Sequence, residues 1–240
     1  MKPHQTLTVI ALLSLAAATT AAAQQHDELK QRVVAQAQSL RDDDYAFTRT
    51  VRSEAVWNSK TFRNVSVEKF DPNKPADARW TLVSVNGAAP SAAELRKYRK
   101  KAAKRRVVPG YHRLGNYFGA PAIASTDAQG RTVFRFDDLP KGSVSILEKD
   151  LSAIASAEAT VSDADGAPFV EQVRVTVPPR RAFAFKIDGY ETTFHYRIGP
   201  GGKPLLSKTT SGISGSGLGL HGTLHTATTY SDYEVVPNSR

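Results

Sequence analysis

Residues 172–198 run QVRVTVPPRRAFAFKIDGYETTFHYRI, a stretch in which apolar and polar residues alternate. A period of two predicts β-strands that bury one face. Turn signals at Asp188-Gly189 and at residues 199–202 (GPGG) divide the region into segments. We therefore expect consecutive strands joined by short turns, which is an antiparallel meander. The face expected to be buried comprises Val173, Val175, Val177, Phe183, Phe185, Ile187, Tyr190, Thr192, Phe194, Tyr196 and Ile198.

Similar patterns lie on both sides of this stretch. A sheet of so many strands must cover its apolar face, either by curling or by packing against helices. The predicted fold is therefore mainly β (α+β), with an antiparallel curled sheet or half-open β-barrel and a helical lid. The glycine-rich residues 211–219 predict a flexible loop or a bulged strand. The further strand-like segments are 45–56, 57–70, 79–85 and 131–136, together with alternating Leu218, Leu220 and Leu224.

Three segments carry helical signals instead. Residues 26–41 begin with acidic residues and place apolar side chains on one face. Ser91 and Glu94 form an S-x-x-E capping box, which predicts a helix over about 91–106. A short helix is predicted around 143–151. The first two helices are the expected lid.

The N-terminal residues 1–23 resemble a secretory signal peptide, with Lys2, a short apolar run and a small-residue site before Gln24. The apolar run is short for a membrane span. The chain has no cysteine, so disulfides and thiolate chemistry are excluded. We expect export to a bacterial periplasm and a single, monomeric domain over 24–240.

The positive charge is concentrated in one segment. The chain has 32 Lys+Arg and 23 Asp+Glu, and residues 96–106 hold eight basic residues and no acidic one. A cationic helix of this kind is either a solvated face or a contact for an anionic surface such as lipid head groups. In the second interpretation the contacts are Lys100, Lys101, Arg105 and Arg106. Nucleic acid is not an expected partner, because its binders usually spread charge over a groove-sized face.

No motif for catalysis, metal binding or cofactor binding stands out. The sequence has no P-loop, no G-x-G-x-x-G and no H-E-x-x-H. His221 and His225 are four residues apart, which on a strand is about 13 Å and too far for one metal ion. The expectation is therefore no cofactor, no metal and no enzyme, although residues distant in sequence could still assemble a hydrolase site.

Aromatic residues recur on the predicted strands. Most such residues fill an ordinary core. In a curled sheet with few covering helices they could instead line a cavity, where an acyl chain gains about 0.8 kcal/mol per buried methylene. The candidate lining residues are Trp57, Trp80, Phe183, Phe185, Phe194 and Tyr196.

The order of export signal, helix, long antiparallel strands, helical interruption and further strands resembles the LolA/LolB-like superfamily of Gram-negative envelope proteins. The pattern Trp80-x-Leu82, Asn86-Gly87, Pro90-Ser91 and Glu94 is also similar to a segment of uncharacterised proteobacterial exported proteins. The resemblance implies a half-open β-barrel with a helical lid, whose apolar cavity carries lipoprotein acyl chains. No cysteine follows the signal, so a lipoprotein of the LolB type is not expected.

The leading functional hypothesis is a periplasmic carrier or binding protein for a lipid or acylated ligand. Its partners would be lipid or lipoprotein acyl chains, with an envelope membrane surface or protein as a further partner. The alternative is an envelope protein-binding or sensor module without lipid cargo, which a cavity filled by side chains would favour.

Overall fold

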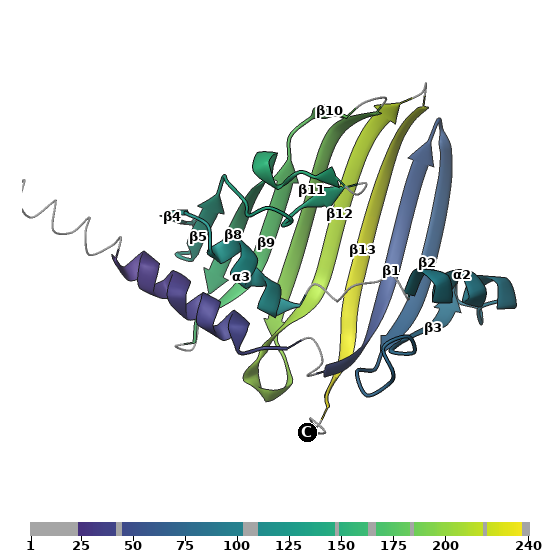
Figure 1. Cartoon of the computed structure of the whole chain (residues 1–240), viewed down its shortest axis with the longest axis horizontal. Helices are drawn as coiled ribbons and strands as arrows, with labels where there is room; N and C mark the ends of the chain where they lie inside the picture. Colours follow the sequence, from purple (N-terminus) through teal and green to yellow (C-terminus); the bar gives the residue numbers. More distant parts are fainter. Residues whose placement is uncertain are drawn as a thin grey trace, which may run out of the picture.

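A computed structural model describes residues 24–41, 45–102, 110–146, 149–162, 167–182, 185–217 and 220–236. One large antiparallel sheet dominates it, in the order β3-β2-β1-β13-β12-β11-β9-β8-β5-β4, with β10 paired to β11 (Figure 1). The sheet curls without closing, because its two outermost strands, β3 and β4, do not pair with each other. This confirms the prediction of a mainly β chain with an open, curled antiparallel sheet. The strands are β1 (Tyr45–Trp57), β2 (Lys60–Phe70), β3 (Trp80–Val85), β4 (Ile123–Thr126), β5 (Thr132–Phe136), β6 (Ser145–Ile146), β7 (Lys149–Asp150), β8 (Ser156–Ser162), β9 (Phe169–Val177), β10 (Arg180–Ala182), β11 (Phe185–Ile198), β12 (Pro204–Gly217) and β13 (Leu220–Val235).

Two tight turns follow the strands β1 and β3, and the first lies inside the segment 57–70 that the sequence predicts as strand. Asn58 and Ser59 both adopt positive φ angles, 43° and 70°, and they join β1 to β2. Two-residue turns with positive φ match the right-handed twist of paired strands. Asn86 and Gly87 repeat this geometry after β3. The first and last strands, β1 and β13, then pair over their whole length and join the N-terminal strands to the C-terminal meander.

Helices cover one end of one face of the sheet. The N-terminal helix (24–38) buries Val33 and Ala37, and α2 (Ala92–Ala102) buries Tyr98. The capping box of α2 is formed, since the Ser91 hydroxyl and backbone N–H both donate to the Glu94 carboxylate at 2.7 Å. The remaining helical elements are η1 (Tyr111–Leu114), α3 (Gly115–Phe118), η2 (Ser152–Ile154) and η4 (Pro200–Gly202).

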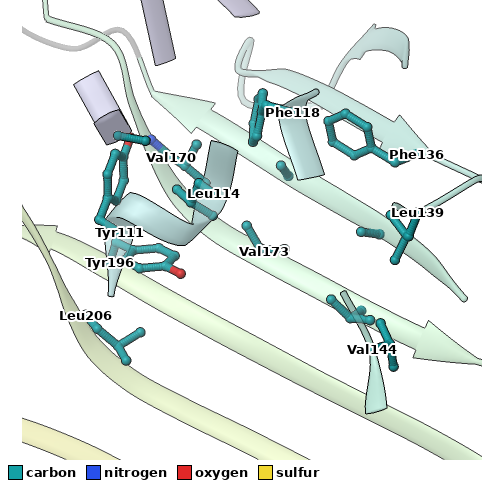
Figure 2. Packing of buried hydrophobic residues seen from close by; sticks show 14 of the residues in the cluster. Tyr111, Leu114, Phe118, Phe136, Leu139, Val144, Val170, Val173, Tyr196 and Leu206 are labelled. Carbon is teal, nitrogen blue, oxygen red and sulfur yellow. The ribbon is translucent and has the colours of Figure 1, made fainter. Parts of the chain in front are cut away.

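The core lies between these helices and the sheet (Figure 2). Phe118 of α3 meets Phe136 of β5 edge to face at 5.1 Å, and Tyr111 of η1 meets Tyr196 of β11 at 5.2 Å. The Tyr111 hydroxyl also accepts from the Val170 backbone N–H and donates to Gln36 of the N-terminal helix. Burial and these hydrogen bonds together hold the helices on the sheet.

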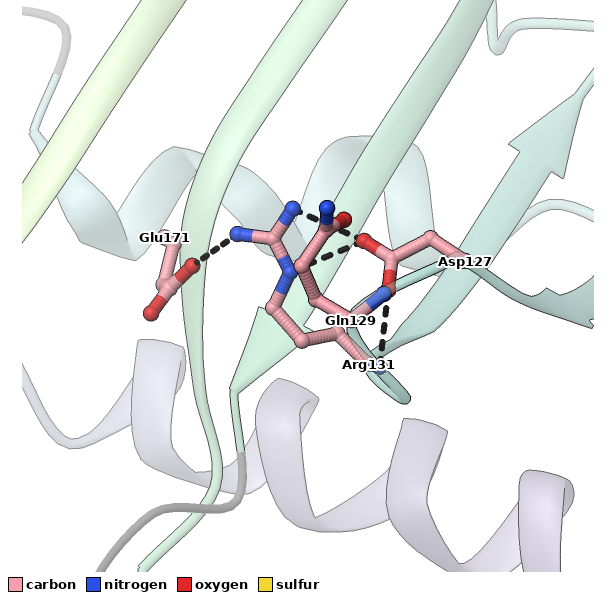
Figure 3. A network of polar contacts seen from close by, with 4 residues as sticks. All are labelled: Asp127, Gln129, Arg131 and Glu171. Carbon is pink, nitrogen blue, oxygen red and sulfur yellow. Dashed lines mark hydrogen bonds and ion pairs between the residues drawn. The ribbon is translucent and has the colours of Figure 1, made fainter.

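A polar network secures the β4 edge (Figure 3). The Asp127 carboxylate accepts backbone hydrogen bonds from Gln129 and Arg131, so it shapes the turn between β4 and β5. The Arg131 guanidinium forms ion pairs with Asp127 at 2.7 Å and with Glu171 of β9 at 2.8 Å. These contacts hold the outermost hairpin of the sheet to a more central strand.

Three local predictions need correction. In the range 143–151 the described residues form no helix: β6 and β7 pair with each other as short antiparallel strands, and Val144 and Ile146 are buried at a spacing of two. Asp188-Gly189 is a register shift inside β11 and not a turn. Of the two alternatives for the glycine-rich stretch, strand is confirmed for residues 211–217, which belong to β12, and the flexible loop is wrong.

Two further points concern the expected signal peptide and membrane-spanning helices. The proposed signal peptide, 1–23, lies outside the described residues. Within the described part of the chain, no helix has the length and apolar character needed to cross a membrane.

Candidate functional site

The face of the sheet that carries the core changes character along the strands. Near the start of β1, this inner face is packed: Phe47 stacks on Phe70 of β2, with ring centroids 5.1 Å apart. Toward the end of β1 the same face is bare, and Trp57 is 46% exposed. Alternate residues of a strand share a face, so the pairing register shows which residues continue the inner face beyond the core.

One row of this inner face is apolar on all six strands that it crosses. We call it the apolar track. Phe62 is 57% exposed and Leu224 38% exposed, whereas Val177 at the far end is 3% exposed and belongs to the core. Five strand spacings make the track roughly 24 Å long. In strand order its residues are Phe62, Ala55, Leu224, Ile213, Tyr190 and Val177.

The next row toward the core is polar. Its central members are Ser53, Thr226 and Ser211, which lie on adjacent strands, and the hydroxyl oxygens of Ser53 and Thr226 are 3.4 Å apart. The row begins at Asn64 of β2, includes Thr192 of β11 and continues to the buried Val175 of β9. An apolar track beside a row of hydroxyls suits an amphiphilic ligand better than a purely apolar one.

The row beyond the track is the last row of residues at this end of the sheet. It contains Trp57, flanked by Lys60 of β2 and by Gly222 of β13. The Trp57 ring lies against Gly222, where a Cβ would overlap the ring atoms. Glycine at this position therefore lets the tryptophan lie flat along the bare end of the sheet.

A hollow of about 950 Å³ spans the strands β2, β1, β13, β12, β11 and β9. Its lining includes Ser211, Ile213, Tyr190 and Val177 of the inner face, and also residues of the opposite face such as Glu54, Arg63 and His225. The other three track residues, Phe62, Ala55 and Leu224, do not line it. Ligand pockets in proteins commonly measure about 300–1,000 Å³. The hollow is therefore large enough for a lipid-sized molecule.

The predicted lining residues do not form one cavity. Trp80 packs against Phe47 and Phe70, Tyr196 is buried against Tyr111, and Phe194 packs on the core. None of these three, nor Trp57, lines the hollow. Phe183 lies outside the described residues, and Phe185 is in β11 with its side chain outside the described part.

Of the four predicted head-group contacts, the structure describes the side chain of Lys100 alone. Lys100 is exposed on α2, Lys101 belongs to α2 with its side chain outside the described part, and Arg105 and Arg106 lie outside the described residues.

A buried cluster holds α2 against the packed end of the sheet. The Tyr98 hydroxyl donates to Glu68 at 3.0 Å, and Arg49 forms an ion pair with the same carboxylate at 2.7 Å. The Arg49 guanidinium also lies 3.9 Å from the centroid of the Trp80 ring, a cation–π arrangement.

The titratable groups show no arrangement typical of catalysis in the described part of the chain. Burial raises the pKa of Tyr196 and Tyr233, so both stay neutral and serve the core. Burial, and to a lesser extent the charge of Lys208, lowers the pKa of His195. No cluster of three metal-ligating side chains is found among the described residues. His221 and His225 are exposed, as the strand spacing predicts.

Phe62 and Leu224 are functional candidates that sequence patterns did not single out. Both fall on predicted strands, and the alternation of Leu220 and Leu224 was visible. What the sequence lacks is the register that places them beside Ala55 in one row. Only the pairing of β1 with β13 reveals the track.

Comparison with known proteins does not identify a family for this chain. No protein-family model matches the chain, and no curated protein does. A solved structure of a LolA superfamily protein from Nitrosomonas europaea is similar over 86% of this chain and 93% of that chain, with 11% identity and a TM-score of 0.35. Such low values carry no weight for function, and the fold described above rests on the strand pairing of this chain.

Proposed function

We propose that this chain is a periplasmic, non-catalytic binding protein that holds a lipid or acylated ligand on the bare inner face of its open sheet. The apolar track carries this proposal, because it continues the core face across six strands while remaining exposed at Phe62 and Leu224. Exposed contiguous apolar surface on a protein commonly marks a binding site.

Ligand chemistry follows from the neighbouring rows. Each methylene removed from water along the track contributes about 0.8 kcal/mol, so an acyl chain is a suitable occupant. The hydroxyls of Ser53, Ser211 and Thr226 lie one row away and offer hydrogen bonds to ester or amide groups. A lipid or lipoprotein acyl chain combines both features.

The first test is recovery of a natural ligand. The chain is purified from a periplasmic preparation and analysed by native mass spectrometry with organic extraction. We expect a near-stoichiometric lipid or acylated peptide. A mass equal to that of the polypeptide alone, together with no uptake of a fluorescent fatty acid, would overturn the proposal.

Site-directed variants locate the ligand. Leu224→Asp places a charge on the track at a partly exposed position, and we expect at least tenfold weaker binding of a fluorescent fatty acid. Thr223→Asp is the matched control, since it adds the same charge one residue away on the opposite face of β13. Equal weakening by both substitutions would contradict a site on the inner face.

A second candidate is an envelope protein-binding module without lipid cargo. The packing of Trp80, Phe194 and Tyr196 into the core favours it, because these aromatic residues leave no deep apolar cavity between them. A clean polypeptide mass accompanied by a stoichiometric protein partner in crosslinked periplasm would select this candidate.

A further inference from the structure

We propose that the end of the sheet around Trp57 docks on an anionic lipid surface. This inference goes beyond the proposed function, because it concerns where the protein sits and not what it holds. The β1–β2 turn, β10 and the start of β13 all lie at this end, at the top of Figure 1. The N-terminal helix, α3 and α2 lie toward the opposite end.

The end row joins an exposed aromatic residue to cations. Trp57 pairs with Lys60 across the turn, and at the other side of the row Arg180 pairs with Ile187 of β11. The intervening positions are Gly222, Gly215 and Ile187, and of these only Ile187, which is buried, carries a side chain. Tryptophan favours the interface between lipid and water, and basic side chains favour anionic head groups.

The charge at this end is unbalanced. Two basic residues near it are neutralised: Lys186 by Asp188 at 2.6 Å and Arg63 by Glu54 at 2.7 Å. Among the described residues, Lys60, Arg180 and Arg181 have no ion-pair partner, and all three are exposed. The surface therefore presents uncompensated positive charge on either side of Trp57, which complements an anionic bilayer.

This surface is distinct from the basic helix α2. The helix is held at Glu68 beside Arg49, eight residues from Trp57 along β1, which is roughly 27 Å. The end row also adjoins the exposed part of the apolar track, so docking there brings the track close to the lipid. Docking through α2 would hold the track away from the bilayer.

Charge reversal tests the docking surface. Co-sedimentation with vesicles of phosphatidylglycerol and phosphatidylethanolamine measures binding, with phosphatidylcholine vesicles as the neutral comparison. The triple variant Lys60→Glu, Arg180→Glu, Arg181→Glu should bind the anionic vesicles about 100-fold more weakly at low salt. The matched control Arg96→Glu, Lys97→Glu, Arg99→Glu makes the same charge change on exposed positions of α2 and should bind within about threefold of the parent protein.

Tryptophan fluorescence gives an independent readout that does not depend on charge. The chain has two tryptophans, and Trp80 packs in the core. Anionic vesicles should shift the emission to the blue, and brominated lipid should quench it. Both effects should vanish in Trp57→Phe, while circular dichroism shows that this variant keeps the parent fold.

The outcomes separate this inference from the proposed function. Loss of vesicle binding in the α2 variant but not in the end-row variant would overturn the docking surface and assign the contact to α2. Equal binding to neutral and anionic vesicles, or no vesicle binding by the parent protein, would also overturn it. Fatty-acid binding by Leu224→Asp and Thr223→Asp is measured without vesicles, so the proposed function stands or fails by itself.

Discussion

At one end of β1, Phe47 is buried and stacks on Phe70; at the other end, Trp57 is exposed and its ring lies across Gly222. Both belong to the same inner face of the same sheet. The packed end holds the aromatic residues that sequence analysis assigned to a cavity. The bare end holds an apolar row and a polar row that are exposed or half-buried on β2, β1 and β13 and become buried at Val177 and Thr192. Stability and binding are therefore separated along the strands.

The largest expected difference between the two ends is in the free energy of unfolding that a Phe→Ala substitution costs at each end. Phe47→Ala removes a buried ring at the packed end and should lower the free energy of unfolding by about 3–5 kcal/mol. Phe62→Ala removes a ring that is 57% exposed and should cost below about 1 kcal/mol. Chemical denaturation measures both values. Equal losses would mean that the bare end is as tightly packed as the core.

Removing one carboxylate charge gives the next largest effect. Glu68 is buried with Arg49, so Glu68→Gln leaves an uncompensated buried charge and should cost about 3 kcal/mol. Glu54→Gln is the matched control, since the Glu54–Arg63 pair is exposed and should contribute below about 1 kcal/mol. A Glu68 loss no greater than the Glu54 loss would show that the buried cluster does not anchor α2.

The smallest expected effect is at the β4 edge. Backbone hydrogen bonds from Arg131, more than its charge, lower the pKa of Asp127. A lowered folded-state pKa means that the stabilisation is complete above the ordinary value of 3.8 and is lost as the pH falls below it. Asp127→Asn should therefore lower the denaturation midpoint slightly at pH 7. The difference from the parent protein should shrink below pH 4, and a difference independent of pH would contradict this role for the carboxylate.

Local patterns predicted much of this fold. Alternation located β1, β5, β9 and β13, and the S-x-x-E sequence located the start of α2. Two errors have the same cause, since both arise where tertiary pairing overrides a local signal. Asp188-Gly189 has turn chemistry, yet pairing with β12 carries β11 through it as a bulge. Residues 143–151 have apolar spacing compatible with a helix, yet antiparallel pairing of β6 with β7 lets Val144 and Ile146 reach the core.

The site was less accessible to sequence analysis than the fold. Aromatic residues on strands identified Trp57, but the same criterion also selected Trp80 and Tyr196, which are packed in the core. Leu224 can be recognised as a candidate binding residue only from its neighbours on β1 and β12. Those neighbours are fixed by pairing between the two ends of the chain, which the sequence does not state.

Binding at the bare end is tested most directly by one titration. A fluorescent fatty acid is titrated into the parent protein, Leu224→Asp and Thr223→Asp, each checked for its fold by circular dichroism. We predict saturable binding by the parent protein, binding within about threefold of it by Thr223→Asp, and at least tenfold weaker binding by Leu224→Asp. Parent-like binding by Leu224→Asp, or no binding by the parent protein, would contradict the assignment of the apolar track as a lipid site.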